Sequence, residues 1–100
     1  MKLLRQGDIL LVEIEDMPRA SKQDGPCILA YGEATGHAHK IEEGAEIWVD
    51  LNDVGKRYLR VLSETKLDHE EHGRIALTRG IYEIVRQREY IPGNVRTVAD

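Results

Sequence analysis

The chain has 100 residues, of which 41% are hydrophobic and 32% charged, proportions typical of one compact domain. Its formal net charge of −4 weighs against general nucleic-acid binding, which needs a basic surface. No apolar run approaches the roughly 18 residues of a membrane helix, and a single cysteine, Cys27, excludes an internal disulfide. We therefore expect one globular domain over residues 1–100, located in a reducing cytoplasm and not associated with a membrane.

Short apolar runs separated by turn residues predict β-strands along most of the chain. Residues 9–15 alternate, so that Leu10, Val12 and Ile14 are expected to face the core and Glu13 to face solvent. Residues 17–26 contain two prolines and an Asp-Gly pair, which predict a surface loop. Further strands are expected at residues 27–32, 37–41, 45–51, 57–63, 74–78 and 80–90.

This series of short strands predicts an all-β fold. We expect a single small antiparallel barrel or sandwich, with at most one short helical turn near residues 63–72. The alternative is an α+β domain in which residues 63–72 form a helix. Because a chain of this size buries only a modest core, a homo-oligomer formed through exposed sheet edges is also expected.

All four histidines fall in two short segments, as His37 with His39 and as His69 with His72. Residues i and i+2 of a strand share a face, so the first pair projects side by side. Residues i and i+3 share a face in a helical turn or a tight loop, which suits the second pair. Imidazoles so spaced suit a divalent transition metal such as Zn, Ni, Mn or Fe(II), and Glu43 is placed to add an oxygen. The predicted metal ligands are therefore His37, His39, Glu43, His69 and His72.

The segment HAHKIEE resembles the first motif of the cupin superfamily, in which HxH is followed by Glu after three or four residues. His37, His39 and Glu43 match that spacing. By this resemblance the three residues bind a catalytic metal inside a small β-barrel, and His69 or His72 is the ligand from a later strand. The resemblance covers residues 32–43, and the second cupin motif has no counterpart. The segments GHAH, HEEH and QREY also resemble those of small bacterial and phage proteins.

Three functions fit this arrangement. With three ligands and one open position, a metal would activate water or oxygen on a small polar or phosphorylated substrate, as in a hydrolase or oxygenase. Without a metal, His37, His39 and His72 would act as general acid and base in phosphodiester or RNA cleavage, with Arg74 near the developing charge. The third is a non-enzymatic, oligomeric binding or accessory module.

A stripe of tyrosines and arginines follows one face of the predicted strand 80–90. Its tyrosines could stack on bases and its arginines grip phosphates, which makes it a candidate substrate surface. The simpler interpretation is that the tyrosines cover a core edge and the arginine stems lie over it. The single cysteine lies in an apolar run and is expected in the core. The candidate substrate-binding residues are Lys40, Tyr82, Arg86, Arg88 and Tyr90.

Overall fold

The fold begins with a β-hairpin. The structure is a computed structural model that describes residues 2–31, 36–91 and 94–97, and within these the side chains only as far as residue 87. Strands β1 (Leu3–Gln6) and β2 (Ile9–Ile14) pair antiparallel through a turn at Gly7, whose φ of 59° suits glycine. The turn leaves Gln6 and Asp8 buried on either side of the glycine. The N-terminal apolar stretch thus folds back on itself.

The main sheet has six strands in the order β1-β2-β10-β7-β6-β3, and every neighbouring pair is antiparallel. Its remaining strands are β3 (Ala20–Lys22), β6 (Ala45–Asp50), β7 (Arg57–Val61) and β10 (Gly80–Arg86). Strand β10 is central, because it pairs with β2 on one side and with β7 on the other. The sheet is open, with β1 and β3 at its edges.

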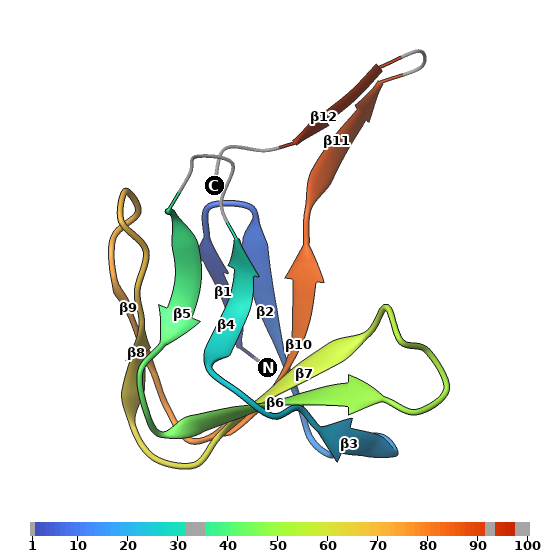
Figure 1. The fold of residues 1–100 in the computed structure, drawn as a ribbon, viewed down its shortest axis with the longest axis vertical. Helices are drawn as coiled ribbons and strands as arrows, with labels where there is room; N and C mark the ends of the chain where they lie inside the picture. Colours follow the sequence, from blue (N-terminus) through green and yellow to red (C-terminus); the bar gives the residue numbers. More distant parts are fainter. Residues whose placement is uncertain (1, 32–35, 92–93, 98–100) are drawn as a thin grey trace.

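Smaller two-stranded sheets complete the described fold. They are β4 (Cys27–Tyr31) with β5 (Ala38–Ile41), β8 (Thr65–Leu67) with β9 (Ile75–Leu77), and β11 (Arg88–Ile91) with β12 (Asn94–Thr97). The β4–β5 and β8–β9 pairs lie beside one another, whereas the β11–β12 hairpin extends away from the rest (Figure 1).

One hydrophobic core joins the main sheet to the β4–β5 and β8–β9 hairpins. Each fully buried aliphatic side chain contributes about 1.5–3 kcal/mol, and every one of these strands except the edge strands β1 and β3 supplies at least one. The buried residues are Ile9, Leu11, Leu29, Ile41, Ile47, Leu59, Val61, Leu67, Leu77, Tyr82 and Ile84. The hairpins thus form a second layer against the open sheet.

The predicted all-β antiparallel class is confirmed. The residues that the structure describes contain no helix, and residues 63–72 form β8 and a loop, so the α+β alternative is wrong. Because the six-stranded sheet is open, the arrangement corresponds to a small sandwich and not to a closed barrel. Within the described ranges, no helix has the length and apolar character needed to cross a membrane.

The predicted core face of β2 is wrong. Leu11 is fully buried, whereas Leu10, Val12 and Ile14 are only half-buried. The run is apolar on both faces, so the prediction depended on Glu13 pointing to solvent. Glu13 lies near the end of the strand, where its carboxylate accepts a hydrogen bond from a backbone N–H of the neighbouring chain segment.

Two strand boundaries also differ from the predictions. The expected loop at residues 17–26 contains β3, which pairs with β6 at the sheet edge. The expected strand at residues 80–90 is interrupted at Gln87, because β10 and β11 have different pairing partners. The tyrosine and arginine stripe therefore does not run along one continuous strand.

Candidate functional site

Two backbone hydrogen bonds bring the two histidine segments together. The N–H of Lys40 donates to the carbonyl oxygen of Asp68 at 3.0 Å, and the N–H of Asp68 donates back at 2.8 Å. In an antiparallel pair the partner numbers run in opposite directions, so position 39 lies across from position 69. Glu70 adds a third link, because its Oε2 accepts from the N–H of Ala38 at 2.9 Å. The HxH strand and the HxxH loop are therefore held side by side.

The four imidazole rings form one group, called the histidine cluster below. The ring centroids of His39 and His69 are 4.4 Å apart, and those of His69 and His72 are 4.7 Å apart. His37 lies 5.4 Å from His69, and His72 lies 6.1 Å from His39. His39 is fully buried and the other three are half-buried. The structure thus brings together all four histidines named from the sequence.

The ring of His69 organises the loop that carries it. Its Nδ1 accepts hydrogen bonds from the backbone N–H groups of Glu71 at 3.0 Å and of His72 at 3.3 Å. A nitrogen that accepts carries no proton, so the neutral His69 ring has its proton on Nε2. This turn, formed by a side chain and the backbone, brings the i and i+3 rings together without a helix.

Gln6 determines which nitrogen of His39 carries the proton. The amide nitrogen of Gln6 donates to the carbonyl oxygens of Leu67 at 2.9 Å and of Gly73 at 3.0 Å. Its Oε1 therefore faces His39 Nδ1, at 2.9 Å. Because an amide oxygen only accepts, Nδ1 must donate, and Nε2 of the neutral ring is left with a lone pair.

The lone pair of His39 Nε2 faces a buried carboxylate. Asp8 Oδ1 lies 3.3 Å from Nε2, and both side chains are fully buried. Neither atom has a hydrogen-bond partner within the described residues. The other oxygen, Asp8 Oδ2, accepts from Nε of Arg86 at 2.6 Å. Two buried acceptors in contact are unfavourable unless a proton or another cation lies between them.

A proton is a poor occupant of this position near neutral pH. The pKa of His39 lies below its usual value, first because burial disfavours the charged ring and then because of the neighbouring His69. His72 lowers this pKa as well, while Asp8 opposes the shift. The Nε2 of His72 is also buried with no hydrogen-bond partner among the described residues. The cluster thus places the lone pair of His39 Nε2 against a carboxylate, with a second buried ring nitrogen, His72 Nε2, in the same group of rings.

In this structure, the side-chain nitrogen and oxygen atoms that could bind a metal do not surround a single point. Within residues 2–31 and 36–87, no three His, Cys, Asp or Glu side chains meet as a metal-binding group. The rings pack on one another instead, with an interplanar angle of 11° between His39 and His72. A metal would therefore require side-chain rotation, which is easier for the half-buried His72 than for the fully buried His39 and Asp8.

The other predicted ligand and charged residues lie around the cluster and not in it. Glu43 is exposed in the turn between β5 and β6, where its carbonyl oxygen accepts from Thr65. The side chain of Lys40 is exposed as well. Arg74, a candidate for stabilising charge in catalysis, is exposed and its Nε donates to Asp68 Oδ1 at 2.5 Å.

The candidate substrate-binding residues of the predicted strand 80–90 do not form one surface in the structure. Tyr82 is fully buried and its hydroxyl donates to the carbonyl oxygen of Thr78, so it is a core residue and is not available to stack on a base. Arg86 is half-buried and bonded to the carboxylate of Asp8. The side chains of Arg88 and Tyr90 lie outside the described part of the chain.

Two residues of the site, Gln6 and Asp8, are missing from the sequence-based candidates. They flank Gly7 in a turn that joins two apolar runs, where polar residues are ordinary. Their burial is the informative signal, and it becomes visible only when the turn packs beneath β5.

The single cysteine, Cys27, is half-buried, and burial raises its pKa to about 11, which agrees with a structural role.

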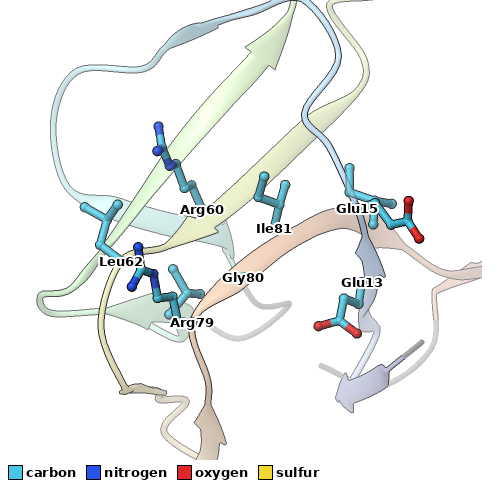
Figure 2. A pocket seen from close by; sticks show the side chains of 9 residues that line it. Glu13, Glu15, Arg60, Leu62, Arg79, Gly80 and Ile81 are labelled. Carbon is cyan, nitrogen blue, oxygen red and sulfur yellow. The ribbon is translucent and has the colours of Figure 1, made fainter.

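The hollow drawn in Figure 2 is not lined by any histidine. It measures about 780 Å³ and lies against β2, β7 and β10. Figure 2 shows Glu13 and Glu15 on one side of it and Arg60 and Arg79 on the other. Its acidic and basic groups balance each other, so the hollow shows no preference for an ion of either sign.

These features define a class: a small, open β-sandwich with a buried polar centre built from four histidines, an aspartate and a glutamine. The chain belongs to a family described as a domain of unknown function, DUF8820, whose model matches residues 5–87. The matched stretch contains every residue of the polar centre. Comparisons with curated proteins and with solved structures gave no match.

Proposed function

We propose that the histidine cluster binds one divalent transition-metal ion through His39, His72 and Asp8. The observation that carries this proposal is the contact of 3.3 Å between His39 Nε2 and Asp8 Oδ1. Zinc bonds to nitrogen and to oxygen are about 2.0–2.2 Å long, so two tetrahedral ligands lie about 3.3–3.5 Å apart. The two fully buried acceptors therefore already have the separation that one shared metal ion requires.

The surroundings of His39 support a ligand role. A histidine ligand usually donates its second ring N–H to a carbonyl or carboxylate oxygen, which fixes the orientation of the ring. Gln6 accepts this hydrogen bond, and its own amide hydrogens are held by two backbone carbonyls. His39 and Asp8 would thus be rigid ligands, and His72 would complete the set by rotating.

His69 has a different role in this proposal. Its Nδ1 holds the loop, so its Nε2 carries a proton and cannot bind a metal in this orientation. His37, whose Nδ1 lies 3.9 Å from the Glu71 carboxylate, is at the rim of the cluster. The proposed ligands differ from those that the cupin resemblance implies. Of the HxH pair, only His39 is a ligand, and Asp8 replaces Glu43 as the carboxylate ligand.

Two nitrogens and one oxygen suit Zn, Ni, Mn or Fe(II), and they leave one position of a tetrahedral ion open. A water molecule at that position would have a pKa near 7, about right for hydrolysis at neutral pH. We therefore propose a metal-assisted hydrolase as the reaction class. His37, His69 and His72 are half-buried, whereas His39 is fully buried.

The alternative of metal-independent acid–base catalysis has weaker support. A general base must reach the proton that it removes. His39 is fully buried, and both of its ring nitrogens already face protein groups, Gln6 and Asp8. His37 and His72 would have to act without it.

A cytoplasmic location remains part of our proposal, supported by the single, half-buried cysteine.

Metal analysis of protein without a histidine tag tests the proposal. The protein is stripped of metal, titrated with Zn, Ni, Mn and Fe(II), and followed by calorimetry and elemental analysis. We expect one equivalent to bind and His39→Gln to abolish binding, while Lys40→Gln, an exposed neighbour on the same strand, leaves it unchanged. Occupancy below about 0.1 equivalent for every metal would refute the proposal.

A further inference from the structure

Two arginines from neighbouring strands lie on one face of the main sheet. In the register of β7 and β10, Arg57 is paired with Ile84, and Arg86 lies two residues further along β10. Side chains two residues apart on a strand share a face, and diagonal neighbours on adjacent strands lie about 7–8 Å apart. Both guanidinium groups then donate to backbone carbonyls of β4, Arg57 to Leu29 and Arg86 to Tyr31. The two cations are therefore held next to each other by the same strand.

The two guanidinium groups line one hollow of about 480 Å³. Leu29 and Tyr31 of β4 form one wall, and Gln23 and Asp24 contribute from the segment before it. Neither guanidinium belongs to the larger hollow of Figure 2, and no histidine lines this one. This hollow, which we call the arginine pocket, is therefore distinct from the other hollow, but it adjoins the histidine cluster because Arg86 binds Asp8.

The lining of the arginine pocket carries two arginines and one acid, Asp24. Arg86 shares its charge with the buried carboxylate of Asp8, at 2.6 Å. Arg57 is half-buried, and no carboxylate whose side chain the structure describes forms an ion pair with it. The pKa of Arg57 is lowered, first by burial and then by the positive charge of Arg86, with Cys27 acting in the opposite direction. A half-buried cation beside a second cation is stabilised by an anion.

We propose that the arginine pocket binds a small oxyanion, a phosphate or carboxylate group of a ligand, between Arg57 and Arg86. Guanidinium groups present planar pairs of N–H donors that match two oxygens of such a group. The exposed Asp24 lies in the lining and repels an anion, so the group is expected to bind at the arginine side. The lining of the hollow in Figure 2 has two acids for two arginines, whereas the lining of the arginine pocket has one acid for two.

Binding is measured by titrating metal-stripped protein with inorganic phosphate and, separately, with acetate, at constant ionic strength in chloride. Stripping the metal removes any effect of a metal bound at Asp8, the partner of Arg86, on the measured anion affinity. We expect saturable binding, and we expect Arg57→Gln to weaken it about tenfold or more, because a charge-assisted contact is lost. Arg60→Gln, an exposed arginine of the same strand, is the matched control and is expected to bind as the wild type does.

Inorganic phosphate and acetate distinguish whether the pocket binds a phosphate group or a carboxylate group. Saturation by phosphate alone assigns a phosphate group, and saturation by acetate alone assigns a carboxylate. Absence of saturation with both ligands, or equal weakening by Arg57→Gln and Arg60→Gln, would overturn the proposal. Asp24→Asn gives a second reading if Arg57→Gln fails to fold. It removes a repelling charge and is expected to raise affinity, so unchanged or lower affinity would also contradict the pocket.

Discussion

The side-chain oxygen of Gln6 lies 2.9 Å from Nδ1 of His39, and this contact determines the chemistry of the cluster. Because the Gln6 amide hydrogens are bound to Leu67 and Gly73, the amide cannot turn over and offer a donor. The His39 proton is therefore on Nδ1, and Nε2 points as an acceptor at Asp8. A buried position made of two acceptors suits a cation.

Gln6→Met should weaken both the fold and metal binding. Methionine fills similar space but leaves the buried Leu67 carbonyl, the partly buried Gly73 carbonyl and one ring N–H without partners, which costs about 1–3 kcal/mol or more. Loss of the group that orients a metal ligand lowers affinity about 10–100-fold. Urea denaturation and metal titration measure the two effects. Gln23→Met, a glutamine in the loop segment before β4, is the control. Unchanged metal affinity in Gln6→Met would show that Gln6 has no orienting role.

Asp8→Asn separates metal binding from stability. The asparagine oxygen can still accept from Arg86, and its amide can donate to Nε2 of His39, so the repulsion between acceptors disappears. We expect the metal-free variant to be as stable as the wild type or more so, and metal affinity to fall by more than the 10–100-fold of an outer partner such as Gln6.

Asp68→Asn is the control for Asp8→Asn, since Asp68 adjoins His69 but pairs with Arg74. Thermal denaturation with and without metal gives the comparison. If Asp8→Asn bound metal as tightly as the wild type, the carboxylate would not be a ligand.

The metal-free protein should lose stability as the pH falls below about 6.5. The folded-state pKa of His39 is lowered, by burial and by the facing His69 and His72 against the opposing charge of Asp8. The unfolded chain, with a His pKa of about 6.5, therefore binds more protons than the folded chain in this range. The stabilisation is fully present above the unfolded pKa and is lost as the pH falls toward the folded one.

Chemical denaturation at pH 7.5, 6.5 and 5.5 measures this dependence. In His39→Gln, the free energy of unfolding should depend less on pH, because the imidazole whose pKa is lowered is absent. A wild-type curve that rises toward acid pH would mean that His39 is protonated and paired with Asp8, and the proton would then occupy the position assigned to the metal.

The pairing of the histidines and their convergence were predicted from the sequence, but the contact that brings the two pairs together was not. Spacing alone indicated that His37 with His39 and His69 with His72 form two chelating pairs. Their meeting depends on the Lys40–Asp68 backbone pair, a long-range contact that carries no local signal. Alternating apolar residues predicted most strands, yet the core face of β2 was wrong because both of its faces are apolar. Asp8 follows a glycine and was indistinguishable from an ordinary turn residue.

His69→Asn tests whether His69 holds the loop or binds the metal. Asparagine can accept backbone N–H groups two and three residues ahead, as the Asp50 carboxylate accepts from Asn52 and Asp53. We therefore expect the loop to survive and metal affinity to change less than in His72→Asn, where a proposed ligand is removed. His69→Ala, which lacks any acceptor, should destabilise the loop that positions His72 and lower both stability and affinity.

Metal titration of the three variants, with amide exchange of residues 71 and 72, distinguishes the two roles of His69. If His69→Asn kept both amides protected yet lost metal as completely as His72→Asn, His69 would itself be a ligand. Its ring would then have to turn over on binding, because Nδ1 cannot hold the loop while Nε2 binds a metal as a neutral ring.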